Sequence, residues 1–301
     1  MKIAVTGAFS YSGKYITRRL LARGDQVITL TNHPRRGDPF GDKVEVQPFN
    51  FNDPDKITES LYLTDILINT YWVRFDRSQN TQSRAVQNTR TLIDSAVQAA
   101  VKKIIHISIT NPSLDSPLPY FSGKAANERS VMNSGLIYTI LRPTVLFGQE
   151  DILINNIAWI LRRFPLMLIP GDGSYQLQPV YVDDLAQLVV EACGNLDNQV
   201  LDAVGPDIYS FREMVEMIGT AIGISRSLIS CPPGIALLGA RLISLLVGDV
   251  VLTREEVAGL IANLLVSKDP PLCKTRLVDW LQSNKYRVGS KYSSELSRHY
   301  I

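Results

Sequence analysis

Residues 2–21, KIAVTGAFSYSGKYITRRLL, place a strand, a glycine-containing turn and a helix in direct succession. The run Lys2–Thr6 is typical of a strand and residues 7–13 of a turn, and the apolar residues that follow recur at helical spacing. A helix start offers unpaired N–H groups and a positive dipole end, and glycine lets a diphosphate come close. The stretch therefore predicts a dinucleotide site, although glycines between a strand and a helix also serve packing alone.

Apolar runs typical of strands alternate with helical patterns along the first half of the chain. The expected strands are residues 2–6, 26–30, 44–47, 65–69, 103–107 and 137–141, and the clearest helices between them are residues 77–100 and 123–134. This alternation predicts an α/β, Rossmann-type fold with a doubly wound parallel sheet. Ligands of such sheets bind beyond the carboxyl ends of the strands, so the residues that follow each strand are the candidate site.

The alternation weakens beyond Gly148, where helices are expected at residues 151–164, 181–193, 211–223 and 254–265. We therefore expect a dinucleotide-binding domain in residues 1–148, completed by about residues 175–205. Residues 149–174 and 206–301 are expected to form a smaller, mainly helical C-terminal region that binds the substrate. Nothing in this region identifies the substrate.

The charge and the cysteine content of the chain limit the kinds of molecule that it can be expected to bind. The 301 residues are 45% hydrophobic and 20% charged, with a formal net charge of +2, too small for nucleic acid as the main partner. A small-molecule substrate is favoured. Cys193, Cys231 and Cys273 have neither disulfide nor metal-ligand spacing, so no metal site is expected. Reduced thiols and the lack of a leader before the first strand predict a cytoplasmic protein.

The most apolar stretch is residues 235–252, which Arg241 and Asp249 interrupt. Both charges would be costly in hydrocarbon, so we expect no integral membrane span. A buried or partner-facing helix fits better. The stretch could pair two copies of the chain, bind a protein partner, or touch a membrane surface.

Tyr120 and Lys124 are four residues apart near the start of an expected helix and so share one face of it. A phenol is a poor base at neutral pH, but a nearby ammonium stabilises its phenolate, which can then exchange a proton with a substrate oxygen. The lysine could also bind the ribose hydroxyls of a dinucleotide. An ordinary helix pair would show the same spacing.

Five segments occur in one order at compatible spacings: Thr6–Gly13, the strand ending in Ser108, Tyr120 with Lys124, residues 141–148 (LRPTVLFG) and residues 180–186 (VYVDDLA). Over roughly residues 1–205 this assembly resembles the short-chain dehydrogenase/reductase superfamily, in its extended or atypical branch of NAD(P)-binding epimerase/dehydratase-like proteins. Its later part is similar to relatives of a mitochondrial complex I accessory subunit. The resemblance implies an NAD(P)-dependent oxidoreductase or epimerase, or a non-catalytic sensor or assembly subunit of the same fold.

The resemblance implies a role for the turn after the first strand. It puts the pyrophosphate on the backbone of Gly7, Ser10, Tyr11 and Ser12, with Gly13 allowing close helix packing. The extended pattern has a glycine where this chain has Ser10. Either the turn is adjusted so that the hydroxyl meets a phosphate, or cofactor affinity is lowered.

At the end of the second strand the family carries an acidic residue when it binds NAD, whereas this chain has Asn32 followed by Arg35 and Arg36. Two arginines suit a 2′-phosphate, which favours NADP over NAD, although a solvated basic loop would look the same. The resemblance also places adenine at Asn50 and Phe51.

The remaining expected site residues follow later strands. The resemblance favours Thr110 as the hydroxyl that orients the substrate oxygen, with Ser108 behind it; both could instead satisfy local backbone groups. Asn69, Thr70 and Tyr71 are expected on the nicotinamide side, and Pro143 at the border of the active site.

Overall fold

The computed structural model describes residues 1–31 and 38–299. The chain divides into two compact units, one of Met1–Pro143 with Asp183–Ala203 and one of Thr144–Val182 with Val204–Ile301. We describe each unit by itself. The assignment of cofactor binding to residues 1–148 and of substrate binding to the remainder stays a prediction.

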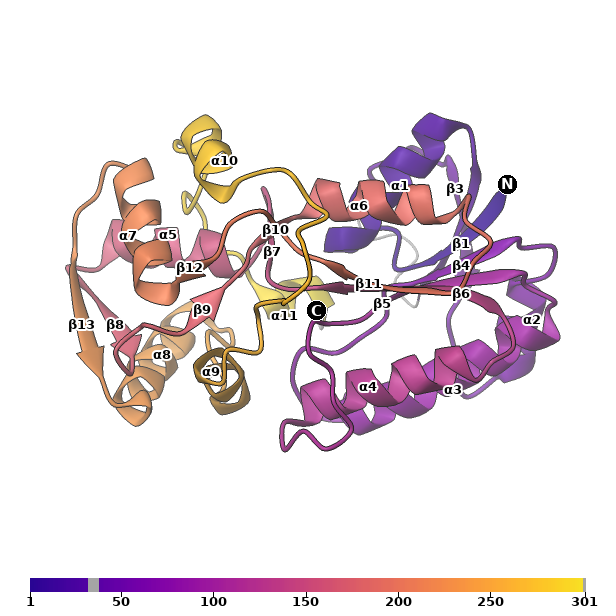
Figure 1. The fold of residues 1–301 in the computed structure, drawn as a ribbon, viewed down its shortest axis with the longest axis horizontal. Helices are drawn as coiled ribbons and strands as arrows, with labels where there is room; N and C mark the ends of the chain where they lie inside the picture. Colours follow the sequence, from indigo (N-terminus) through magenta and orange to yellow (C-terminus); the bar gives the residue numbers. More distant parts are fainter. Residues whose placement is uncertain (32–37, 300–301) are drawn as a thin grey trace. The chain divides into compact units, whose positions relative to one another are not determined.

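The first unit contains a seven-stranded, wholly parallel sheet in the order β11-β6-β5-β4-β1-β2-β3 (Figure 1). The strands are β1 (Lys2–Thr6), β2 (Gln26–Thr31), β3 (Val44–Pro48), β4 (Ile66–Asn69), β5 (Lys103–Ile107), β6 (Ile137–Pro143) and β11 (Gln199–Ala203). All residues of β4 and β5 are buried, which explains why isoleucine and leucine dominate these strands. The predicted doubly wound parallel sheet is confirmed.

Helices cover both faces of this sheet. They are α1 (Tyr11–Arg23), α2 (Pro54–Ser60), α3 (Gln82–Gln98), α4 (Pro119–Met132) and α6 (Val182–Ala192). Figure 1 shows α1 and α6 on one side and α2, α3 and α4 on the other. The guanidinium of Arg19 on α1 binds the carboxylate of Asp183 on α6 at 2.8 Å, joining the two helices of one face.

Two helix starts differ from the expected ones for a local reason. The helix expected from residue 77 begins at Gln82, because the Thr81 side chain caps it by accepting from the N–H of Arg84 at 3.1 Å. The helix expected from residue 123 begins at Pro119, whose fixed φ suits the first helical position. Tyr120 therefore lies in the first turn of α4 and Lys124 in the second.

The second unit combines helices with three two-stranded ribbons, β7 with β10, β8 with β13 and β9 with β12. The strands are β7 (Leu146–Phe147), β8 (Leu166–Pro170), β9 (Gln176–Leu177), β10 (Val180–Tyr181), β12 (Tyr209–Ser210) and β13 (Ser227–Cys231). The helices are α5 (Leu153–Arg163), α7 (Phe211–Ala221), α8 (Pro233–Val247), α9 (Arg254–Ile261), α10 (Leu277–Asn284) and α11 (Glu295–His299). Its core packs Phe147, Ile157, Met214 and Leu281 together. Among the described residues, no helix combines the length and apolarity that crossing a membrane needs.

Candidate functional site

The turn between β1 and α1 is shaped by two glycines. Gly7 has φ +69°, a left-handed backbone that glycine adopts without strain. A Cβ on Gly13 would lie 2.0 Å from the carbonyl oxygen of Gly7, so only glycine lets α1 start this close to the end of β1. The N–H of Ser10 donates to the same carbonyl at 2.8 Å and closes the turn. The turn is thus held tight by backbone packing that requires glycine at residue 13.

Ser10 occupies the N-cap position of α1, with φ −74° and ψ 175°, and its side chain makes no capping hydrogen bond. Its Oγ lies 2.9 Å from the point where a Cβ of Gly13 would stand. The serine side chain thus leans back over the two glycines. The turn accommodates it because neither Gly7 nor Gly13 carries a side chain.

The ends of β1, β4 and β5 are joined by a buried hydrogen-bond network around Asn69. Its Oδ1 accepts from Thr6 Oγ1 at 3.2 Å and from the N–H of Tyr71 at 3.0 Å, and its Nδ2 lies 3.1 Å from His106 Nδ1. Burial, together with the charge of Lys124, lowers the pKa of His106 to about 3, so the imidazole is neutral and Nδ1 accepts. The Asn69 amide is therefore occupied within the protein, and it fixes the backbone that leads to Thr70 and Tyr71.

Lys124 lies beneath the carboxyl end of β5 and is only 3% exposed. Its Nζ donates to the carbonyl oxygen of Ile107 at 2.9 Å and stands 4.9 Å from the ring centroid of Trp72. Burial lowers the pKa of Lys124 to about 7, and the carboxylate of Glu128 partly opposes this. The site thus contains an ammonium whose charge is poised near neutral pH.

Trp72 links this ammonium to Tyr120. The rings of Trp72 and Tyr120 meet edge to face, with centroids 5.7 Å apart and planes at 84°. A Cβ on Gly123 would lie 2.7 Å from the Trp72 ring, so the indole sits against α4 where the helix has no side chain. The indole Nε1 is buried without a hydrogen-bond partner among the described residues. The sequence places Trp72 in the segment 69–72 that follows a strand, but the sequence interpretation gave it no role of its own, and Gly123 between Tyr120 and Lys124 was the available signal.

Ser108 and Thr110 both follow β5 and are buried, but their hydroxyls differ. Thr110 Oγ1 donates to the carbonyl oxygen of Arg142 at 3.0 Å. Ser108 Oγ has no hydrogen-bond partner among the described residues. The Thr110 hydroxyl is thus already used by the backbone, and that of Ser108 is the one left for another group.

The N–H of Thr110 donates to the carbonyl oxygen of Pro143 at 3.0 Å, which keeps the chain beyond β5 against β6. Phe51 packs on Phe49 and Tyr71, with ring centroids 4.4 and 5.2 Å away, at the ends of β3 and β4. The Asn50 side chain accepts from the N–H of Asn52 at 3.1 Å. The expected cofactor residues Asn32, Arg35 and Arg36 lie outside the described residues.

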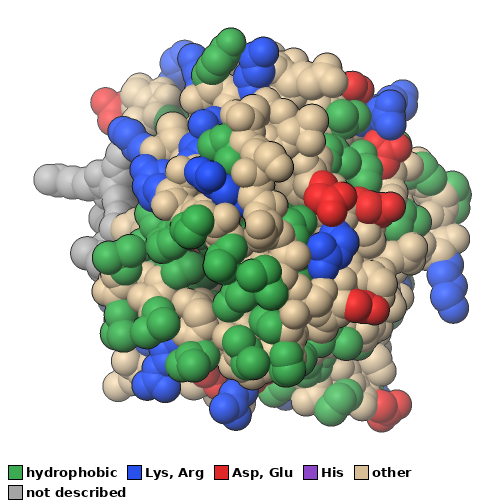
Figure 2. Space-filling view, turned by 90° about the vertical axis from the view of Figure 1, so that its left-hand side faces the viewer, with side chains coloured by type: hydrophobic (Ala, Val, Ile, Leu, Met, Phe, Trp, Pro, Cys, Tyr) green, Lys and Arg blue, Asp and Glu red, His purple; other side chains and the backbone are tan. Residues whose placement is uncertain are grey.

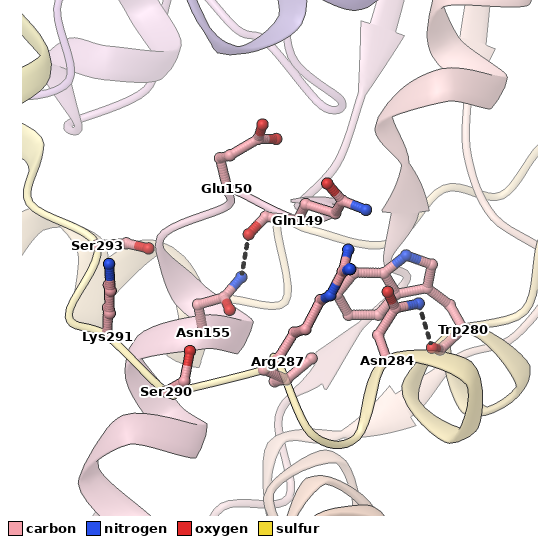
Figure 3. A pocket seen from close by; sticks show the side chains of 10 residues that line it. Gln149, Glu150, Asn155, Trp280, Asn284, Arg287, Ser290, Lys291 and Ser293 are labelled. Atoms are coloured by element: carbon pink, nitrogen blue, oxygen red, sulfur yellow. Dashed lines mark hydrogen bonds between the residues drawn. The ribbon is translucent and has the colours of Figure 1, made fainter.

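The second unit has a pocket of about 300 Å³, shown in Figure 3. Its lining includes the cationic side chains of Arg287 and Lys291, the carboxylate of Glu150, the Trp280 indole and the amides of Asn155 and Asn284. Asn155 Nδ2 donates to the carbonyl oxygen of Gln149 at 3.4 Å, and Asn284 Nδ2 to that of Trp280 at 2.8 Å. Neither Arg287 nor Lys291 forms an ion pair with a described residue.

Two protein families match parts of this chain. A family described as NAD(P)H-binding matches residues 7–157, and the 3-beta hydroxysteroid dehydrogenase/isomerase family matches residues 123–209. Among characterised proteins, the chain is 27% identical over 229 residues to NADH dehydrogenase (ubiquinone) 1 alpha subcomplex subunit 9, mitochondrial, of Arabidopsis thaliana. That match covers 71% of this chain and 56% of the relative, so the chain spans little more than half of the relative's length.

Solved structures share the fold. An NADPH-dependent quinone oxidoreductase from Escherichia coli, complexed with NADPH, has a TM-score of 0.77 at 17% identity, covering 93% of this chain and 99% of that one. A nucleoside-diphosphate-sugar epimerase from Staphylococcus aureus has a TM-score of 0.73 at 19% identity, covering 94% of this chain and all of that one.

Proposed function

Because the chain belongs to the NAD(P)H-binding family, within the extended branch of the short-chain dehydrogenase/reductase superfamily, we propose that it is an NAD(P)-dependent oxidoreductase or epimerase/dehydratase-like enzyme. Its substrate would be a small molecule with a carbonyl or hydroxyl group. The first unit would carry the cofactor and the proton-transfer residues. The expected cytoplasmic location stays a prediction.

The turn after β1 supports the cofactor part of the proposal. The backbone of Gly7 and residues 10–13 would hold the diphosphate, because the start of α1 lies directly after β1, where Gly13 lets the helix pack on the Gly7 carbonyl. Asn50 and Phe51 would border the adenine, and Thr70, Tyr71 and Pro143 the nicotinamide end. NADP is favoured over NAD on the sequence alone, through Arg35 and Arg36.

The observation that carries the proposal is the buried ammonium of Lys124, one helical turn after Tyr120. The cofactor, when bound, would exchange a hydride with the substrate carbon. Tyr120 would exchange a proton with the substrate oxygen, and the charge of Lys124 would stabilise the phenolate. The unpartnered Ser108 hydroxyl is available to orient that oxygen, ahead of Thr110.

The pocket of the second unit has a lining with more positive than negative side chains. Arg287 and Lys291 bring two cations and Glu150 one carboxylate, and the indole of Trp280 offers a flat apolar surface. This lining would suit a substrate that carries an anionic group and a planar or apolar part.

The test is to compare wild type with Tyr120→Phe in two measurements: NADPH and NADH fluorescence titration, and turnover on a panel of quinones, aldehydes and sugar nucleotides. We expect Tyr120→Phe to bind the cofactor as wild type does and to lose activity by at least about a hundredfold, the usual size of a general acid–base contribution. Tyr62→Phe, at an exposed tyrosine of the same unit, is the matched control and should keep full activity. Unchanged turnover in Tyr120→Phe would remove Tyr120 from the mechanism.

A second candidate is a non-catalytic NAD(P)-binding sensor or assembly subunit. The similarity to a subunit of NADH dehydrogenase favours it. Saturable cofactor binding with no turnover on any substrate class, together with a defined complex with another protein, would favour this second candidate.

A further inference from the structure

Helix α8 in the second unit carries large apolar side chains on its solvent side. Ile235, Leu238, Leu242, Leu245 and Leu246 are each between 52 and 76% exposed. Their spacings of three and four residues place them on one stripe of the helix. Isolated exposed leucines are common, but a continuous stripe of five large apolar side chains indicates a surface that binds a protein or a membrane.

The opposite face of α8 holds small residues. Ala236 and Ala240 are buried, and a Cβ on Gly239 would lie 2.8 Å from Leu168 of β8. A helix that served only the core of its own unit would turn its leucines inward and its small or polar residues outward. The pattern of α8 is the reverse, so this helix is built to present its leucines.

The neighbouring ribbon extends the apolar face. In β8 and β13, Leu168 pairs with Ile229, and Leu166 precedes Leu168 by two residues, so all three point to the side on which α8 packs. Leu166 and Ile229 remain 39 and 43% exposed at the margin of the helix. Figure 2 shows hydrophobic side chains gathered on this side of the molecule.

The charged side chains within α8 and next to β13 are arginines. Residues 217–248 contain only two charged side chains, Arg226 and Arg241, and the buried Asp249 follows α8. Arg226 donates to the carbonyl oxygen of Leu161 at 3.0 Å. Neither arginine forms an ion pair with a carboxylate of a described residue.

We propose that α8 and the β8–β13 ribbon dock on the surface of a lipid bilayer that contains anionic lipids. Leucines would enter the acyl boundary while the arginines reach the headgroups, as in helices that lie in the interface plane. At 15 residues α8 is about 22 Å long, less than the roughly 30 Å of hydrocarbon, so it lies on the membrane. Two copies joined by this face would bring the same arginines together, which disfavours a homodimer.

The test is flotation of the full-length protein with vesicles of phosphatidylcholine, alone or mixed with phosphatidylglycerol. We expect the protein to float with the mixed vesicles and much less with phosphatidylcholine alone. Leu242→Ser with Leu245→Ser should weaken binding by about tenfold for each leucine. Arg226→Gln with Arg241→Gln should reduce binding to the mixed vesicles toward the level seen without phosphatidylglycerol.

Leu196→Ser is the matched control, because Leu196 is 77% exposed in the first unit, and it should float as wild type does. Circular dichroism and the thermal midpoint establish that each variant folds. The proposal is overturned if wild type stays at the bottom with mixed vesicles, or if the double serine variant floats equally well. A wild-type dimer that the double serine substitution converts to a monomer, without vesicle binding by either, would assign the face to a second copy. These outcomes are independent of cofactor binding.

Discussion

Lys124 ties helix α4 to the end of strand β5, because its Nζ donates to the carbonyl oxygen of Ile107 at 2.9 Å. This hydrogen bond fixes the N-terminal part of α4 against the sheet. It therefore also positions Tyr120, which lies in the first turn of α4. It also takes an ammonium out of water, which lowers the pKa of Lys124 to about 7. The arrangement that suits proton transfer therefore costs stability.

This cost predicts a pH-dependent effect of Lys124→Met. Since the pKa of Lys124 is lowered on folding, the unfolded chain binds more protons than the folded chain above about pH 7. The free-energy cost of burying Lys124 therefore falls as the pH rises from about 7 toward the pKa of the lysine in the unfolded chain. Lys124→Met should therefore raise the free energy of unfolding by roughly 2 kcal/mol more at about pH 6 than at about pH 9. Urea unfolding at both pH values measures the difference.

Lys43→Met serves as its control, since Lys43 is an exposed lysine of the same unit, and its effect should be the same at both pH values. If the effect of Lys124→Met on the free energy of unfolding is the same at both pH values, the pKa of Lys124 is not lowered by burial.

The parallel sheet could be predicted because its strands are buried on both faces and are mostly apolar in sequence, as β4 and β5 are. The β8–β13 ribbon could not, because Ser227–Cys231 lacks a continuous apolar run. The orientation of α8 was also beyond the sequence, since a helix with one charged residue in its length has no polar face to mark its outer side.

The site was predictable where chemistry fixes spacing, as with Tyr120 and Lys124, and where backbone geometry demands glycine, as at Gly7 and Gly13. The contact of Trp72 with Tyr120 was not predicted, because it depends on how the indole packs against α4. Whether the hydroxyl of Ser108 or of Thr110 is left for a ligand depends on which of them bonds a backbone carbonyl. The sequence does not show this, and the structure shows it for Thr110. The roles of these residues stay predictions.

Asp151 holds the entry to α5 in the second unit. It is 1% exposed and accepts from the N–H of Ile154 at 2.7 Å, from the N–H of Gly148 at 3.3 Å and from Asn155 Nδ2 at 2.8 Å. Asp151→Ala would remove the side-chain acceptor of the buried N–H groups of Gly148 and Ile154 and should lower the free energy of unfolding by about 2–3 kcal/mol. Urea unfolding checks the value, with Asp269→Ala at an exposed position as control, expected within about 0.5 kcal/mol of wild type. Equal stability of Asp151→Ala and Asp269→Ala would refute the role of Asp151.

The central claim is that the turn of residues 7–13 holds the diphosphate of a dinucleotide. It is tested most directly by fluorescence titration of NADPH and NADH with wild type, Gly13→Ala and Gly234→Ala. A Cβ at residue 13 would lie 2.0 Å from the Gly7 carbonyl oxygen and must reshape the turn, whereas a Cβ at residue 234 meets no atom within 4 Å. We predict saturable binding by wild type and Gly234→Ala and at least a tenfold loss of affinity, about 1.4 kcal/mol, in folded Gly13→Ala. Absence of binding by wild type, or equal binding by folded Gly13→Ala, would contradict the account.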